Sequence, residues 1–496
     1  MKKYTLIAIL LITVIMIVPA IASCANEPAA ADILTTAAIT EETTAENNPE
    51  PELPVSDFGG ESFMFLLRLT NIAYDEVYVY TEEYDGEVVN DAIYDRNRAV
   101  EEKFNIDIEA AFNDSVSQTA RKAIMANDNS FEAMWDSKNA MPALITNGFL
   151  IDFNTIPYVN LAADYWDKNA SEQLAVLNKL YFMPSDMSMQ NLSGARFLYF
   201  NKKLIQDYTL DDPYERVHSN SWTLDVVLNM IKSVSADLNG DGIMDSNDRF
   251  GILSEGGAAN ANILYFIKSA GVRNTTNDGD GIPQLSFMNE KTIKISEMCK
   301  EVLDDKNVSI TYETASKGAS LGDFPHYFAY CRGALFTTDH FLFVQNGVEE
   351  TVSFKDMESD YGIAPNPKFD SSQAEYSHRI DPFTTIMAIP ITNQDLERTG
   401  IILEYMSWLS HDTVYPAYFD TTIKTKRVRD NEAPMIVDLI KSSISYEISD
   451  IFDLGITSML WDGYASGNMS STYAKKEAGI QKKLDKLVED LLKIGE

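Results

Sequence analysis

The sequence predicts an α/β fold, and three neighbouring segments early in its folded part carry this prediction. Residues 63–67 (FMFLL) form a short apolar run that follows Gly59 and Gly60 and precedes polar residues, as expected of a buried strand. In residues 90–104 (NDAIYDRNRAVEEKF) the apolar side chains recur at helical spacing, and the NIDIEAAF that follows has the pattern of a second strand. A strand, a helix and a strand in succession indicate a parallel sheet.

Similar patterns continue to the end of the chain. Helical spacing predicts helices at residues 117–127, 223–234, 290–303, 394–410 and 471–494. Short apolar runs predict strands at residues 197–200, 334–337 and 385–391. No run after the N-terminal one approaches the length of a transmembrane helix.

The first 23 residues have the layout of a secretory signal peptide, with Lys2 and Lys3 before an apolar stretch at residues 6–22. The sequence Ile-Ala-Ser-Cys ending at Cys24 resembles the bacterial lipobox, in which the cysteine receives a diacylglycerol and becomes the mature N-terminus. Residues 24–56 are rich in Thr, Glu, Ala and Pro, and we expect a disordered spacer because so few apolar groups are present. An ordinary signal peptide or an uncleaved anchor is the alternative.

Composition limits the classes of partner. The formal net charge of −35 becomes −37 once Lys2 and Lys3 leave with the signal peptide, and such a polyanion repels nucleic acid and anionic lipid headgroups. The residues beyond the spacer, with 45% hydrophobic composition over the whole chain, suffice for two domains with real cores. Lipidation would use Cys24, and for Cys299 and Cys331 two separate buried thiols are favoured over a disulfide.

Several blocks together resemble extracellular solute-binding protein family 1, the maltose-binding-like group. They are DGEVVNDAIYDRNRAVEEKFNIDIE, FLYFNKKLIQDYTLDDPYE, WTLDVVLNMIKSVSADLNGDGIMDSNDRFGI, YCRGALF and DYGIAPNPKFDSSQAEY, in the family's order. The resemblance implies a two-lobed periplasmic-binding-protein-like fold of class II, closing on a ligand in the cleft. Lobe 1 would comprise residues 57–195 and 383–412, and lobe 2 residues 196–382 and 413–496. The implied crossings lie near residues 194–199, 378–386 and 410–414.

The resemblance also nominates ligand-binding residues, because sugar recognition uses flat aromatic faces and planar polar side chains. The predicted ligand-binding residues are Trp135, Asp136, Asn139, Asp186, Asp339, Phe341 and Asp453, with Trp166 as a further candidate. For each of them a core aromatic or a solvated carboxylate is the alternative interpretation.

The segment DLNGDGIMDSND has oxygen-bearing side chains spaced as in a calcium-binding loop, with glycine at its sixth position. The predicted ligands of a structural Ca²⁺ are Asp237, Asn239, Asp241, the Ile243 carbonyl, Asp245 and Asp248. The twelfth position holds the shorter Asp248 where glutamate is usual, and a turn without a metal is the alternative.

No catalytic constellation stands out: the five histidines form no HExxH pair, and there is no G-x-S-x-G elbow or P-loop. We therefore expect not an enzyme but a monomeric binding lipoprotein on the extracytoplasmic face of the cell membrane. It would deliver a small solute, a sugar or oligosaccharide above all, to ABC permease subunits. A binding protein for peptides or another solute, and a surface adhesion lipoprotein, are the alternatives.

Overall fold

The computed structural model describes residues 48–69, 79–256, 262–317, 327–348, 353–354, 357–381, 384–419 and 431–495. The chain from Pro49 onward forms one compact unit. The predicted signal peptide, Cys24 and most of the predicted spacer lie outside the described residues. Within the described ranges, no helix combines the length and the apolar character that crossing a membrane requires.

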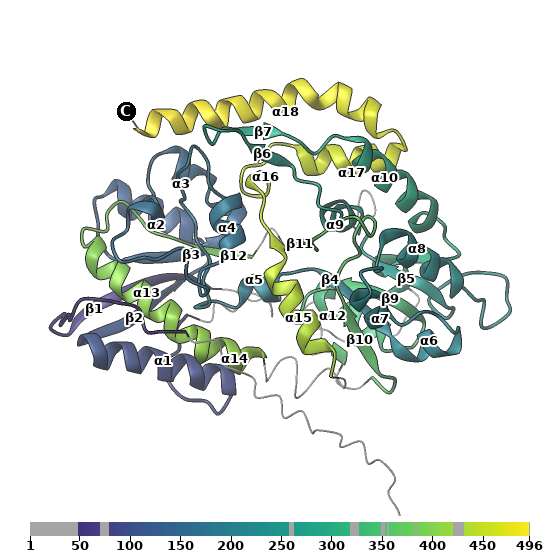
Figure 1. Ribbon diagram of the computed structural model, residues 1–496, viewed down its shortest axis with the longest axis horizontal. Coiled ribbons are helices and arrows are strands. Elements are labelled where there is room, and N and C mark those ends of the chain that lie inside the picture. The colour runs from purple at the N-terminus through teal and green to yellow at the C-terminus, as the bar shows by residue number, and fades with distance from the viewer. Residues whose placement is uncertain are drawn as a thin grey trace, which may run out of the picture. The chain divides into compact units, whose positions relative to one another are not determined.

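The first lobe is built on a four-stranded sheet in the order β12-β3-β1-β2 (Figure 1). β1 pairs in parallel with β2 and β3, whereas β12 pairs antiparallel to β3. The predicted strand, helix and parallel strand are confirmed as β1, α1 and β2. The strands are β1 (Glu61–Arg68), β2 (Ile106–Asn113), β3 (Ala133–Ser137) and β12 (Thr385–Ala388). The helices are α1 (Val88–Phe104), α2 (Val116–Met125), α3 (Pro142–Thr146), α4 (Lys168–Gln173), α5 (Gln190–Ser193), α13 (Leu396–Asp412) and α14 (Val414–Phe419), with 3₁₀ turns η1 (Lys138–Ala140) and η2 (Phe153–Thr155).

The second lobe contains a five-stranded sheet in the order β10-β4-β9-β5-β8, in which β9, β5 and β8 are parallel. β4 is antiparallel to both of its neighbours. The strands are β4 (Phe197–Asn201), β5 (Phe250–Ser254), β8 (Ser309–Thr311), β9 (Phe341–Asn346) and β10 (Tyr361–Ala364). The helices are α6 (Lys202–Asp207), α7 (Pro213–His218), α8 (Leu224–Ser233), α9 (Asn262–Ser269), α10 (Glu290–Leu303), α11 (Tyr312–Ala315), α12 (Tyr327–Phe336), α15 (Ala433–Ser442), α16 (Ile448–Ile451) and α17 (Ile456–Ser466).

Two crossover segments run side by side between the lobes, at two of the places that the resemblance implied. Ala195 pairs antiparallel with Ile380, and the Arg196 N–H donates to the Arg379 carbonyl at 3.1 Å. A Cβ atom at Gly194 would lie 2.3 Å from Thr384 Oγ1, so this close approach requires glycine. The segments therefore join the two sheets through one closely packed junction. A short parallel pair, β11 (His378–Arg379) with β13 (Ile444–Ser445), extends the same region.

The third crossing between the lobes does not lie at residues 410–414, where the resemblance implied it. Helix α14 packs against α1 and α13, both of which belong to the first lobe. The chain therefore leaves this lobe only after Phe419, and α15 then contacts β10 in the second lobe. The sequence alone missed this because α13 and α14 are separated by the single residue Thr413, which marks a helix boundary but not a change of lobe.

Two elements bridge the lobes near the C-terminus. Helix α18 (Met469–Leu492) packs on α17 and α10 and also on α3, and Figure 1 shows it lying across both lobes before the final turn η5 (Lys493–Gly495). The hairpin of β6 (Thr275–Asn277) and β7 (Pro283–Leu285) reaches the first lobe, where the Leu177 N–H donates to the Gly281 carbonyl at 2.8 Å. The lobes therefore touch well beyond the crossovers.

The core confirms some sequence predictions and corrects one. Cys299 and Cys331 are both buried and are not joined in a disulfide, as favoured. Residues 334–337, predicted as a strand, lie at the end of helix α12 and in the turn that follows it. A short apolar run is buried on all sides in either structure, so its periodicity does not separate a strand from a buried helix.

Candidate functional site

In open α/β sheets, ligands bind outside the carboxyl ends of the parallel strands. In the first lobe β3 ends at Ser137, directly before Lys138. In the second lobe β5 ends at Ser254, directly before Glu255, and Asn346 ends β9. Because η1 packs against α16, the two lobes meet at this level. We therefore expect a ligand-binding site at these strand ends.

Charged side chains gather here from both lobes and from the crossovers. Arg196 pairs with Asp381 at 2.8 Å, Arg379 with Asp450 at 3.2 Å, and Arg332 with Glu255 at 3.2 Å. We call these residues and Lys138 the strand-end cluster. Burial alone would lower the pKa of Arg379, but Asp450, Tyr265 and Asp381 outweigh it and raise that pKa. The Arg379 guanidinium is therefore held in its charged form beside Asp450.

Lys138 differs from the other members of the cluster. Its side chain is buried, with 2% of the residue exposed, and within the described chain its ammonium group has no hydrogen-bond or ion-pair partner. Its backbone N–H donates to the Thr384 carbonyl at 3.2 Å, which fixes the start of η1 beside the crossover. Burial lowers the pKa of the Lys138 amine to about 8, with Asp450 and Asp381 opposing the shift and Arg379 adding to it. At neutral pH the cluster therefore carries one unpaired positive charge.

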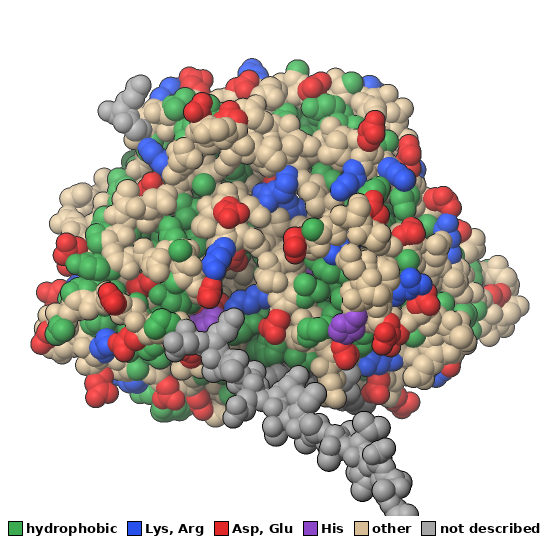
Figure 2. All heavy atoms as spheres, in the orientation of Figure 1, with side chains coloured by type: hydrophobic (Ala, Val, Ile, Leu, Met, Phe, Trp, Pro, Cys, Tyr) green, Lys and Arg blue, Asp and Glu red, His purple; other side chains and the backbone are tan. Residues whose placement is uncertain are grey.

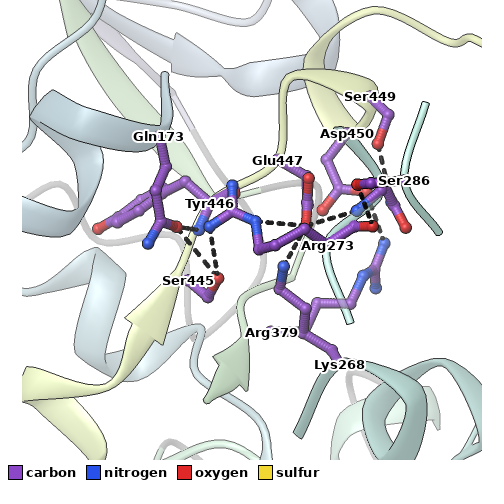
Figure 3. Close-up of polar contacts among 11 residues, drawn as sticks. Gln173, Lys268, Arg273, Ser286, Arg379, Ser445, Tyr446, Glu447, Ser449 and Asp450 are labelled. Carbon is purple, nitrogen blue, oxygen red and sulfur yellow. Dashed lines mark hydrogen bonds and ion pairs between the residues drawn. The ribbon is translucent and has the colours of Figure 1, made fainter. Parts of the chain in front are cut away.

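A second polar network holds α16 in place. Figure 3 shows Lys268 and Arg273 pointing toward Glu447, which also accepts from the Asn274 N–H at 3.1 Å. The Gln173 side chain of α4 accepts from the Tyr446 N–H at 2.8 Å, so the first lobe joins this network. The Asp450 carboxylate on α16 is thereby positioned next to the crossovers.

Two predicted ligand residues on β3 serve the core of the first lobe. The Trp135 ring is 2% exposed and packs edge-on against Phe65 at 5.4 Å between centroids, so it has no free face for a sugar in this structure. The buried Asp136 carboxylate accepts from the backbone N–H groups of Ser117 at 2.8 Å and Ser137 at 2.7 Å. It therefore anchors the start of α2.

Asp339 and Phe341 lie at the amino end of β9, opposite the strand ends that carry the cluster. Phe341 is fully buried and stacks on Phe250 at 6.1 Å, and Asp339 accepts from Asn201 at 2.6 Å. The sequence placed them on the wrong edge of the sheet because it does not show which end of β9 faces the other lobe.

Asn139 and Asp453 are exposed and flank the contact between η1 and α16. Asn139 directly follows Lys138, and Asp453 lies two residues beyond α16. Their positions agree with the predicted cleft, and their contact with a ligand stays a prediction.

Trp166 and Asp186 come together in a pocket of about 350 Å³, which we call the α5–α15 pocket. Lys441 of α15 pairs with Asp186 at 3.0 Å and lies over the Tyr415 ring, 3.4 Å from its centroid. Asp186 also accepts from His411 at 2.6 Å, and this bond is the main cause of the raised pKa of His411. The pocket is a second place where a small molecule fits, and α5, which lines it, directly precedes the first crossover.

Sequence reasoning nominated no member of the strand-end cluster. Arg332 lies in the quoted block YCRGALF, and Lys138 directly follows the segment that contains Trp135 and Asp136. Tyr265 and Tyr312, both largely buried, border Glu255 and Arg332 and supply aromatic rings from the second lobe. Lys138 and Glu255 directly follow β3 and β5, where ligands bind in open α/β sheets.

The predicted calcium loop is folded as a series of hydrogen-bonded turns. Asp237 accepts from the N–H groups of Gly240 at 2.7 Å and Gly242 at 2.8 Å, and Asp248 accepts from those of Leu238 and Asp245, each at 2.9 Å. Among the residues described, no group of three or more His, Cys, Asp or Glu side chains is placed to hold a metal ion. The donor set as folded does not form a metal cage, and calcium binding stays a prediction.

Comparison with known proteins finds likeness in structure alone. No family model matches the chain, and no curated protein sequence matches it. A cyclo/maltodextrin-binding protein in complex with maltotetraose is 14% identical with a TM-score of 0.52, covering 87% of this chain and 96% of its own. The GacH receptor of Streptomyces glaucescens, solved unliganded and with acarbose, is 14% identical with a TM-score of 0.51 (87% and 99% covered). RafE from Streptococcus pneumoniae, in its apo form, is 11% identical with a TM-score of 0.52 (88% and 98% covered). The two-lobed fold predicted from the resemblance is confirmed.

Replacing Lys138 by methionine should stabilise the protein at neutral pH, because it removes a buried charge without a partner and leaves the three ion pairs intact. A pKa lowered from 10.5 to about 8 corresponds to a penalty on the order of 3 kcal/mol. The penalty is complete below pH 8 and fades as the pH rises to 10.5, so the advantage of Lys138→Met should shrink over that window. Urea unfolding from pH 7 to 10 measures it. Lys486→Met on exposed α18 is the control, and a destabilised Lys138→Met at pH 7 would contradict the assignment.

If the loop from Asp237 to Asp248 binds calcium, millimolar Ca²⁺ should raise the melting temperature and a chelator should reverse the rise. Asp241→Ala should abolish this response, since the Asp241 carboxylate is exposed and caps only the local turn. Melting curves that coincide with and without Ca²⁺ would show that the loop folds as hydrogen-bonded turns and does not bind the metal.

Proposed function

We propose that the protein captures a carbohydrate between its two lobes and passes it to an ABC importer. The single observation that carries this proposal is the two-lobed fold with paired crossovers, shared along nearly the whole length of proteins solved with maltotetraose and with acarbose. The neighbours are binding proteins by their descriptions, which favours capture over catalysis. The strand-end cluster is the proposed binding site.

The contacts of the cluster suit a ligand that touches both lobes. Within the cluster, Lys138 comes from the first lobe, while Glu255 and Arg332 come from the second. The exposed Asn139 lies next to Lys138. Carboxylate and guanidinium groups bond pairs of hydroxyls. The buried rings of Tyr265 and Tyr312 pack under Arg379 and Arg332 and so help to fix the guanidinium groups. A ligand that bonds to both lobes favours the closed arrangement over an open one by its differential affinity.

We also propose an extracytoplasmic location with a lipid on Cys24. The signal-like N-terminus and the Thr-, Glu- and Pro-rich stretch after it support this proposal. Two or more acyl chains anchor a protein stably, whereas one does so only marginally. The partners would then be the membrane, through the lipid, and the permease subunits.

A thermal-shift screen of residues 25–496 against mono- and oligosaccharides, peptides and polyamines tests the function. A saccharide at a hundred times its dissociation constant should add about 2.7 kcal/mol to stability. Glu255→Gln should weaken binding about tenfold or more, while Asp438→Asn in the α5–α15 pocket should leave it within about twofold. The reverse order would move the ligand to that pocket. Stabilisation by no saccharide at all would refute the function.

The anchor has its own test. Cys24→Ala should release the protein from the membrane fraction or stop its processing, and labelled palmitate should mark only the parent protein. Normal cleavage with unchanged membrane retention in the variant would contradict the lipid assignment.

A further inference from the structure

The charges of the strand-end cluster do not balance. Its three carboxylates, on Glu255, Asp381 and Asp450, are each paired with an arginine. Lys138 is left as a fourth cation, buried to 2% exposure and without a partner in the described part of the chain. The site therefore holds one positive charge more than the protein itself neutralises.

An arrangement of this kind is costly for the protein alone. A buried ammonium loses its hydration, and the attraction of Asp450 and Asp381, neither of which forms an ion pair with Lys138, offsets that loss only in part. Figure 2 shows acidic side chains spread among basic ones over the visible face, and the chain has 75 acidic against 40 basic residues. Among the described residues no carboxylate forms an ion pair with Lys138, although Asp450 and Asp381 act on it from farther away. We therefore expect the ligand to supply the group that offsets the charge of Lys138.

We propose that the ligand is an acidic saccharide, of the uronic acid class, whose carboxylate pairs with Lys138. This inference rests on the proposed function and adds the chemical class of the substrate. The carboxylate would lie on the first-lobe side, next to η1, and the sugar hydroxyls would face Glu255 and Arg332 of the second lobe. A charge-assisted bond made in a buried site is stronger than a bond between neutral groups.

Matched disaccharides test the proposal by calorimetry. One arm compares digalacturonate with its neutral galactose counterpart, and a second compares a glucuronate-containing disaccharide with its neutral glucose counterpart. In at least one arm the acidic member should bind about tenfold more tightly or better at pH 7. The preference should fall between pH 7 and pH 9, because burial lowers the pKa of Lys138 to about 8.

Variants assign the preference to Lys138. Lys138→Met should abolish the difference between acidic and neutral members, Lys138→Arg should keep part of it, and Lys486→Met on the outer face of α18 should keep all of it. Because Lys138→Met is expected to be at least as stable as the parent, lost discrimination would not reflect misfolding, and its melting curve checks this.

Each outcome separates this inference from the function it rests on. Equal affinities for acidic and neutral members would overturn the inference and leave carbohydrate capture standing. A sulfated disaccharide that binds as tightly as the uronates would overturn the carboxylate assignment. Binding of neither saccharide class, with an acidic peptide bound instead, would overturn both proposals.

Discussion

The close pairing of the two crossover segments is the constraint on which the rest of the structure depends. Gly194 and Thr384 approach so closely that no side chain fits between them, and Ala195 pairs with Ile380 just beyond. The Gln190 side chain accepts from the Thr385 N–H at 2.7 Å, which ties α5 to the start of β12. Lys138 also takes its place from this junction, through its backbone bond to Thr384. The crossover junction thus determines both how the two sheets are joined and where Lys138 lies.

Charge is arranged differently at the two buried networks near this junction. Around Glu447, Lys268, Arg273 and the Asn274 N–H converge on one carboxylate oxygen, Oε1, and this network fixes α16. At the strand ends the pairs are also complete, but Lys138 is added without a counterpart. Both networks hold one more cation than carboxylates, but both cations of the first network reach the Glu447 carboxylate, whereas Lys138 forms no ion pair within the described chain. The first network therefore fixes α16, and the proposed ligand contact lies at Lys138 in the second.

The sequence predicted the architecture better than the site, for a physical reason. Helices such as α10 and strands such as β1 follow from local periodicity, and the paired lobes follow from the order of family-like blocks. A binding residue depends on which end of a strand faces the cleft, and local pattern does not contain that. Trp135 and Phe341 were therefore nominated as stacking rings, yet both are core residues. Lys138 escaped notice because a lysine after a strand looks ordinary until its surroundings are known.

Helix α18 has a consequence for how the protein is made. It is the last helix of the chain, it packs on α3 of the first lobe as well as on α10 and α17, and Ile494 lies where a side chain at Gly148 would meet it at 3.1 Å. Translation proceeds from the N-terminus, so every earlier element leaves the ribosome before this brace exists. The first lobe also waits for β12, which forms the edge of its sheet. A growing chain therefore lacks both the α18 brace and the β12 edge strand until late in synthesis, so the first lobe reaches its final packing only after residues far along the sequence have been made.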